Sequence, residues 1–161
     1  MDGKILLGYK KRGFGKNKYN GFGGKVEEGE TILQAAVREL EEEAGITAPL
    51  EYAGTLLFLT KGLDMPAFHI DIFRSDEYSG VIIETDEMRP QWFSIPSSSS
   101  KDIVLDETCD IPFAQMWDTD PLWIPLLLSK KIFVGRADFS LEGDVFSPRK
   151  WWIGVPSDNN A

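Results

Sequence analysis

Cysteine and histidine are nearly absent from this sequence of 161 residues, which contains one of each, Cys109 and His69. A single cysteine excludes an intramolecular disulfide and fits a reducing compartment. A single histidine excludes a zinc site built from several histidines, and without a histidine partner His69 is better interpreted as a strand residue than as a base. Neither residue predicts catalytic chemistry.

Positive charge is also scarce. The chain has 17 lysines and arginines against 26 aspartates and glutamates, which gives a formal net charge of −9 at pH 7. Proteins that grip polymeric nucleic acid through its phosphates need a basic surface, so this balance argues against such a partner. Small phosphorylated molecules are still possible ligands, because a metal ion and nearby lysines can offset the negative charge of the protein.

Long hydrophobic runs are missing as well. The longest apolar stretch, 122–128, is interrupted by Pro125 and is too short to span a bilayer, and residues 1–7 do not resemble a targeting segment. We therefore expect no membrane partner and a monomer in the cytoplasm, with the nucleus or mitochondria as further locations. The length suits one domain, which we place at 1–156, with a polar loop insertion near 97–110 and a flexible tail at 157–161.

The sequence does contain a well-marked helix behind a glycine-rich loop. Thr31 fits the N-cap with Gln34 as its capping-box partner, and Gly45 fits the left-handed position after the last turn, so we expect a helix at 31–44. A glycine-rich loop lets the backbone approach a ligand closely. The glycines ahead of the helix are Gly21, Gly23, Gly24 and Gly29.

Three glutamates, Glu39, Glu42 and Glu43, fall on one turn of this helix. At this spacing their side chains are neighbours and repel one another unless a positive charge lies between them. Mg²⁺ takes oxygen ligands and shares itself with substrate phosphates, so the cluster indicates a magnesium site. The competing interpretation is a solvated acidic face in which Arg38 pairs with Glu42, and the run of like charges without a lysine partner disfavours it.

The stretch 24–46 resembles the Nudix box, a pattern of glycines, glutamates and one arginine at fixed spacing. Every fixed position is filled, by Gly24, Glu30, Arg38, Glu39, Leu40, Glu42, Glu43, Gly45 and Ile46. The resemblance implies hydrolysis of a diphosphate linked to another group, with Mg²⁺ or Mn²⁺. It assigns metal binding to Glu39, Glu42 and Glu43. Glu30 would be a supporting acid, and Arg38 would orient a glutamate.

Most of the chain is similar, more narrowly, to the oxidised purine nucleoside triphosphate hydrolases of the MutT-homologue type. The segments that carry this similarity are 10–15, 19–25, 84–93 and 111–128. It implies release of a monophosphate and pyrophosphate from substrates such as 8-oxo-dGTP and 2-oxo-dATP, an 8-oxo-dGTP diphosphatase activity that sanitises the nucleotide pool and prevents DNA damage. Glu87 would help to bind metal or to activate water.

The same resemblance implies a pocket for the purine. Asn20 and Asp120 would read the edge of the base, and Lys10 would lie near the nucleotide. Residues expected to enclose the base or contact the substrate are Phe14, Phe22, Gly23, Gly24, Lys25, Met88, Trp117 and Trp123. The alternatives are core positions for aromatic residues, favoured for Trp92 and Phe113, and plain surface charge for Lys10 and Lys11.

One departure from the family concerns base recognition. Family members carry proline and two consecutive aspartates after the matched tryptophan, whereas this chain reads Trp117, Asp118, Thr119, Asp120. Threonine can donate or accept a hydrogen bond but cannot ionise, so the accepted purines would be fewer or different, with Asp118 as a candidate to compensate. Two other functions stay open: a Nudix hydrolase for another diphosphate-linked substrate, and a nucleotide-binding module without catalysis.

The order of predicted elements indicates an α+β protein. We expect strands at 4–9, 50–60, 67–73, 81–83, 91–95 and 132–141, and a second helix at 121–131. The resemblance implies the Nudix fold, a mixed curved β-sheet flanked by helices in an α/β/α sandwich. Family members usually begin with a further strand ahead of the position of Lys4, and we expect that strand to be missing here. Either the sequence is truncated, or another segment, with the C-terminal one as the candidate, covers the exposed edge of the sheet.

Overall fold

The computed structural model describes residues 3–61, 67–95, 110–143 and 145–157, which fall into two compact units. The predicted loop insertion at 97–110 and tail at 157–161 lie, except for their residues 110 and 157, outside the described residues, as does Cys109. None of the helices in the described ranges has the length and apolar character needed to cross a membrane. A single domain over 1–156 stays a prediction.

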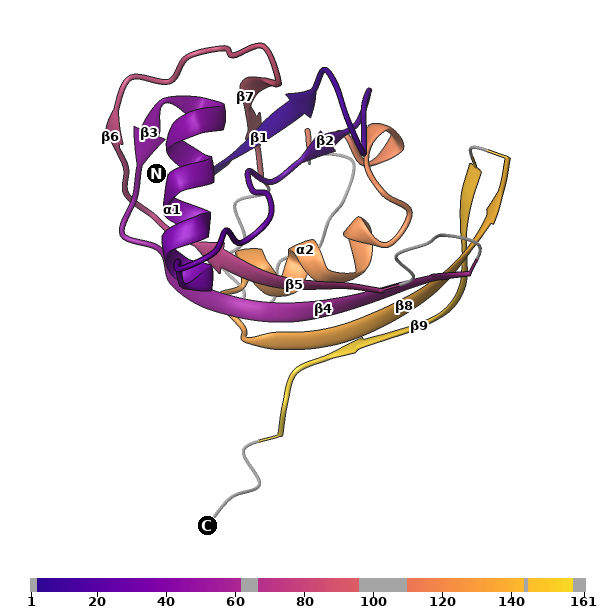
Figure 1. The fold of residues 1–161 in the computed structure, drawn as a ribbon. Helices are drawn as coiled ribbons and strands as arrows, with labels where there is room; N and C mark the ends of the chain where they lie inside the picture. The colour runs from indigo at the N-terminus through magenta and orange to yellow at the C-terminus, as the bar shows by residue number, and fades with distance from the viewer. Residues whose placement is uncertain (1–2, 62–66, 96–109, 144, 158–161) are drawn as a thin grey trace. The chain divides into compact units, whose positions relative to one another are not determined.

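The first unit contains a helix and two small antiparallel sheets (Figure 1). In the larger sheet, β1 is the central strand and pairs with β2 on one side and β7 on the other, while β3 pairs with β6 in the smaller one. The elements are β1 (Lys4–Lys10), β2 (Tyr19–Asn20), α1 (Ile32–Ala44), β3 (Ile46–Thr47), β6 (Ser79–Gly80), β7 (Met88–Ser94) and the 3₁₀ helix η1 (Phe113–Gln115).

Helix α1 forms as the sequence predicts. The Thr31 hydroxyl accepts a hydrogen bond from the Gln34 amide at 3.2 Å, and the Gln34 side chain accepts one from the Thr31 amide at 2.7 Å, a complete capping box. Gly45 closes the helix at a φ of 73°, in the left-handed region. The helix buries Leu40 and Ala44 in the core of the unit, which fixes the direction of the acidic turn between them.

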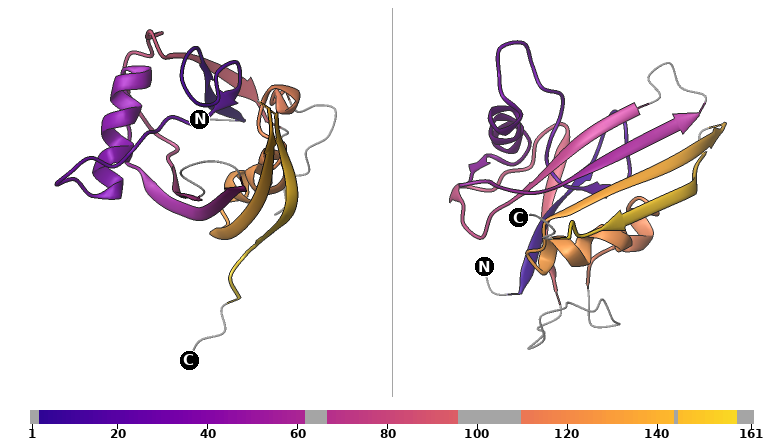
Figure 2. Two further views of the ribbon diagram at one scale, coloured as in Figure 1. Left: turned by 45° about the vertical axis from the view of Figure 1, so that its right-hand side comes forward. Right: turned by 90° about the horizontal axis from the view of Figure 1, so that it is seen from below.

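The second unit is a mixed sheet with one helix packed on it. Its strands lie in the order β5, β4, β8, β9, with β4 and β8 parallel and β8 and β9 antiparallel, and Figure 2 shows them side by side in a curved sheet. Helix α2 packs Trp123 against Phe133, with ring centroids 5.7 Å apart. The elements are β4 (Glu51–Lys61), β5 (Ala67–Arg74), α2 (Asp120–Leu128), β8 (Phe133–Glu142) and β9 (Val145–Gly154). The predicted α+β class with a mixed, curved sheet is confirmed.

The prediction of a strand at 81–83 is wrong. Val81 and Ile83 are 75% and 50% exposed, and the segment that follows β6 passes the end of α1, where the Ile83 amide donates to the Ala44 carbonyl at 3.0 Å. Apolar side chains with β-branching suggested a strand, but no neighbouring strand pairs with this segment among the described residues.

Two further differences lie in the second unit. The sequence analysis missed strand β9, because Pro148 and the charged residues after it interrupt its apolar alternation. Helix α2 ends at Leu128 rather than at the predicted 131, and Lys130 takes a left-handed φ of 56°. His69 lies in β5, as expected for a strand residue.

Candidate active site

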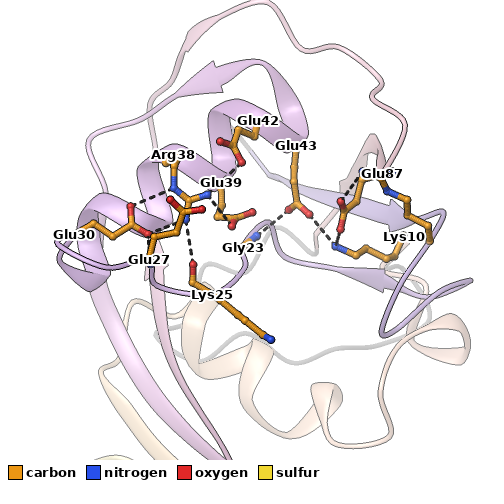
Figure 3. A network of polar contacts seen from close by, with 11 residues as sticks. Lys10, Gly23, Lys25, Glu27, Glu30, Arg38, Glu39, Glu42, Glu43 and Glu87 are labelled. Atoms are coloured by element: carbon orange, nitrogen blue, oxygen red, sulfur yellow. Dashed lines mark hydrogen bonds and ion pairs between the residues drawn. The ribbon is translucent and has the colours of Figure 1, made fainter.

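Arg38 forms hydrogen bonds with acidic side chains of α1 and of the loop ahead of it (Figure 3). Its guanidinium donates to Glu30 at 2.8 and 3.1 Å and to the backbone carbonyl of Lys25 at 3.1 Å. It also donates to Glu39 at 2.9 Å and to Glu42 at 3.2 Å. The hydrogen bonds to Glu30 and Glu39 raise the pKa of Arg38, and the bond from Arg38 lowers the pKa of Glu30. These contacts fix where the Glu39 and Glu42 carboxylates lie.

Glu43 is the buried acid of the turn, with 5% of its side chain exposed against 60% for Glu42. The Gly23 amide donates to its Oε2 at 2.9 Å, and Lys10 Nζ donates to its Oε1 at 2.9 Å. Burial raises the pKa of Glu43 in spite of these two donors. The Glu43 carboxylate of α1 is therefore contacted both by the glycine-rich loop and by β1.

Lys10 links Glu43 to an acid that is distant in sequence. Its Nζ lies 2.5 Å from Oε1 of Glu87, the residue before β7, because β1 pairs with β7 and sets Lys10 opposite Met88. Arg12 also contacts Glu87, at 3.3 Å. The hydrogen bond from Lys10 lowers the pKa of Glu87, and although burial opposes it, the bonds to Glu87 and Glu43 raise the pKa of Lys10.

These acids line one cleft of about 240 Å³ within the first unit. Its lining is Arg12, Glu39, Glu42, Glu43, Thr85, Asp86 and Glu87. Within the described residues no three potential ligands converge on one point, since Arg38 and Lys10 hold the carboxylates toward themselves. The donor set still fits a divalent ion, because carboxylate oxygens are the ligands that Mg²⁺ and Mn²⁺ prefer and the Lys10 ammonium already stands as a cation between two of them.

Two glycines beside the cleft allow close approach of neighbouring side chains. A Cβ on Gly24 would collide with the Glu39 carboxylate, so the loop backbone lies directly against this acid. A Cβ on Gly8 would come within 2.8 Å of Met88 and 2.9 Å of Phe22. The close approach at Gly8 lets Met88, which is 1% exposed, pack beside the ring predicted to enclose the base.

A second group of predicted residues surrounds Trp117, also within the first unit. The Trp117 indole donates to Asn20 Oδ1 at 3.0 Å, and Phe14 stacks on the Trp117 ring with centroids 5.3 Å apart. Lys18 lies 5.0 Å above the same ring and donates to the Met116 carbonyl. The sequence analysis missed Lys18, although its position two residues before Asn20 places the two side chains on one side of an extended chain.

Thr119 and Asp120 belong to the second unit and are both buried, at 1% and 5% exposed. Asp120 accepts a hydrogen bond from the Trp123 indole at 3.1 Å. The Thr119 hydroxyl, in contrast, has no hydrogen-bond partner among the residues that the structure describes. Asp118, the candidate to compensate for threonine, is exposed. The unusual threonine is thus a buried, unsatisfied polar group, which requires an explanation.

Burial and ion pairing distinguish the alternatives for two lysines and two aromatic residues. Lys10 is only 13% exposed and is no plain surface charge, whereas Lys11 pairs with the exposed Glu84 at 2.8 Å, as a surface lysine does. Trp92 and Phe113 are half-buried rather than core residues. In β7 it is the neighbouring Phe93 that is buried, at 8% exposed, because successive strand residues face opposite sides.

A larger and more open groove of about 720 Å³ lies on β8 and β9 in the second unit. Its lining contains no residue predicted for the site. Arg136 pairs there with Asp138 at 2.7 Å, and Arg149 pairs with Glu142 at 2.8 Å. Because its arginines already have acidic partners, the groove offers less positive charge than its composition suggests.

Comparison with known proteins places these residues in a family context. A profile described as the NUDIX domain matches residues 1–102. A Danio rerio protein named "Oxidized purine nucleoside triphosphate hydrolase" is 50% identical over 138 residues, 85% of this chain and 80% of that protein. A Mus musculus protein of the same name is 43% identical over 145 residues, which is 89% of this chain and 84% of that protein.

Solved structures agree on the fold. The chain resembles the crystal structure of the mMutator MutT protein from Bacillus halodurans with a TM-score of 0.71, over 94% of this chain and 90% of that one. At 23% identity this likeness concerns the fold alone. It confirms the fold that the sequence predicted.

Proposed function

Because this chain belongs to the Nudix family of hydrolases, we propose that it hydrolyses oxidised purine nucleoside triphosphates, of the 8-oxo-dGTP and 2-oxo-dATP type, to the monophosphate and pyrophosphate. The observation that carries the proposal is the 50% identity to a relative named for this activity. The chain would thereby sanitise the nucleotide pool and prevent DNA damage. We propose that it does so as a monomer in the cytoplasm or in the nuclear or mitochondrial pool.

Nudix hydrolases generally use a divalent metal ion, and we propose Mg²⁺, with Mn²⁺ as a substitute. Glu39, Glu42, Glu43 and Glu87 would hold it, since they supply hard oxygen donors around one cleft. When bound, the ion would neutralise charge on the phosphates and acidify a water molecule. Arg38 supports this set by holding the carboxylates of Glu39 and Glu42.

The proposed chemical step is attack by water on a phosphorus of the triphosphate chain. The water oxygen forms a bond to phosphorus, the bridging P–O bond breaks, and pyrophosphate leaves. Glu43 or Glu87 accepts the proton of the water. Glu43 is the better candidate: Lys10 acts to lower the pKa of both carboxyls, but the deeper burial of Glu43 raises its pKa overall, and a stronger base accepts a proton more readily.

The base is proposed to stack against aromatic rings and to be read by polar groups. Phe14 and Trp117 are already stacked and offer a flat face to a purine. Asn20 can accept and donate on the base edge, but it would have to share its carbonyl with the Trp117 indole that it now binds. Asp120 would read a second part of the edge. In the first unit, Phe22 and Met88 would also contact the base, and Gly23, Gly24 and Lys25 would contact the phosphates. Trp123, in the second unit, is proposed as a further contact to the base.

Product analysis tests the reaction. Purified chain is stripped of metal with a chelator, Mg²⁺ is added back, and the products from 8-oxo-dGTP are separated by chromatography. The proposal expects monophosphate and pyrophosphate only after Mg²⁺ is added. Formation of diphosphate and inorganic phosphate would contradict it, and so would equal turnover in the presence of the chelator.

Thr119 supports a second candidate, hydrolysis of another diphosphate-linked substrate by the same glutamates. The position expected to carry a base-reading aspartate holds a buried hydroxyl instead. A panel of other Nudix-type substrates, sugar nucleotides and cap-like dinucleotides among them, separates the two candidates. Folded protein without metal-dependent turnover on any diphosphate would instead favour a binding module without catalysis.

A further inference from the structure

Lys10 carries its positive charge between two of the proposed metal ligands. Its ammonium lies 2.9 Å from Glu43 Oε1 and 2.5 Å from Glu87 Oε1, and Figure 3 shows it between the two carboxylates. The lysine side chain is 13% exposed and that of Glu43 is 5% exposed. Water and salt therefore screen this contact less than they screen a surface ion pair.

The two cations of the site differ in how easily they can leave. Arg38 is held by hydrogen bonds to Glu30, Glu39, Glu42 and the loop backbone, a fork geometry that fixes it in place. Lys10 is a point charge on a flexible four-carbon stem, and among the residues that the structure describes its ammonium pairs with Glu43 and Glu87. Of the two, Lys10 is the one that can move aside without breaking a network.

We propose that Lys10 competes with the divalent ion for Glu43 and Glu87 and thereby sets the metal affinity of the site. The inference rests on the metal role stated in the proposed function. Without metal, the lysine offsets the repulsion between the two acids. After displacement, its ammonium becomes available to a phosphate oxygen of the substrate, which would tie metal binding to substrate binding.

Titration calorimetry with Mn²⁺ alone, in the absence of nucleotide, tests the proposal. Lys10→Met removes the competing charge at similar side-chain length, and the dissociation constant for Mn²⁺ should fall roughly tenfold. Lys11→Met is the matched control, because it removes the same charge from an exposed pair with Glu84 and should leave the constant unchanged. Lys10→Gln is titrated in parallel, because it can still hydrogen-bond to both carboxylates if the methionine variant does not fold.

Each outcome is decisive. Tighter Mn²⁺ binding by a folded Lys10 variant, but not by Lys11→Met, supports the proposal. An unchanged or weaker constant in the Lys10 variants overturns it and leaves the proposed hydrolysis intact, since the unaltered chain still binds metal. No binding of Mn²⁺ by any of the chains overturns both this inference and the proposed metal role.

Discussion

Burial separates Glu43 from the other glutamates of its turn. Its carboxylate receives a backbone donor from Gly23 and an ammonium from Lys10, whereas Glu39 and Glu42 share the Arg38 guanidinium. Three glutamates on one helix turn thus lie in two different environments. Such differences in environment allow similar side chains to have different roles in a site.

Replacement of Glu43 by glutamine should reduce turnover by about 10²-fold or more, because the amide cannot accept a proton from water. The variant should keep the circular dichroism spectrum of the unaltered chain, since glutamine has the same shape. Glu41→Gln is the control: it removes an exposed carboxylate of the same helix that has no proposed role. Near-normal turnover of the Glu43 variant would contradict the proposed role of Glu43 as the base.

Thr119→Val addresses the unsatisfied hydroxyl. Because the hydroxyl has no partner among the described residues, its removal should change the free energy of unfolding by less than about 1 kcal/mol. If it reads the base, the ratio of kcat/KM for 8-oxo-dGTP to that for dGTP should fall by roughly tenfold.

Urea unfolding and kinetics on both substrates measure these two effects. Thr60→Val, at another threonine that is 3% exposed, controls for the substitution itself. Strong destabilisation of the Thr119 variant would mean that the hydroxyl is bonded within the protein. An unchanged substrate ratio would remove Thr119 from the specificity account.

At the scale of elements, helix α1 is the part that the sequence predicts best. Its capping box and its Gly45 terminus are both local signals, and each appears in the structure at the predicted residue. The ends of α2 and the strand β9 were less predictable, because Pro148 and a left-handed Lys130 override the local pattern. Strands with a clear apolar pattern, such as β4, β5 and β8, were also predicted close to their observed bounds.

In the site, too, contacts between residues close in sequence were easier to predict than contacts between distant ones. The three box glutamates could be predicted from spacing, because a helix turn brings them together. The Lys10 bridge could not, since it depends on the register that sets β1 against β7. Lys18 was missed for a similar reason: its contact with Trp117 joins residues far apart in the chain.

Gly45→Ala tests the end of α1. The left-handed conformation costs a residue with a Cβ about 1–2 kcal/mol, and the added carbon would also meet Ile83 at 2.6 Å and the Val81 carbonyl at 2.8 Å. Gly13→Ala is the matched control, because Gly13 has a similar φ of 75° and nothing within 4 Å of an added Cβ. Urea unfolding should show a larger loss of stability for Gly45→Ala, and equal losses would contradict the steric argument.

At the scale of the whole molecule, two compact units share one interleaved chain. Within the described residues, the chain passes from one unit to the other at 51–52, 74–75 and 117–118. Separate domains are usually joined by few linkers, and units of this size hold only small cores. We therefore predict that the two units behave as one domain.

Differential scanning calorimetry measures this cooperativity. A single transition is expected, with a calorimetric enthalpy equal to the van't Hoff enthalpy. Phe133→Ala, which empties a core position of the second unit, should cost about 3–5 kcal/mol and lower the midpoint of that whole transition. Two resolved transitions, with only one of them shifted by Phe133→Ala, would show that the units unfold separately.

The proposed function requires this chain to select oxidised purine nucleoside triphosphates. Initial rates of pyrophosphate release with Mg²⁺ from 8-oxo-dGTP, 2-oxo-dATP and undamaged dGTP, measured in parallel, test this selectivity. We expect a higher kcat/KM for at least one oxidised purine than for dGTP. Equal values for all three substrates, or a preference for dGTP, would contradict it.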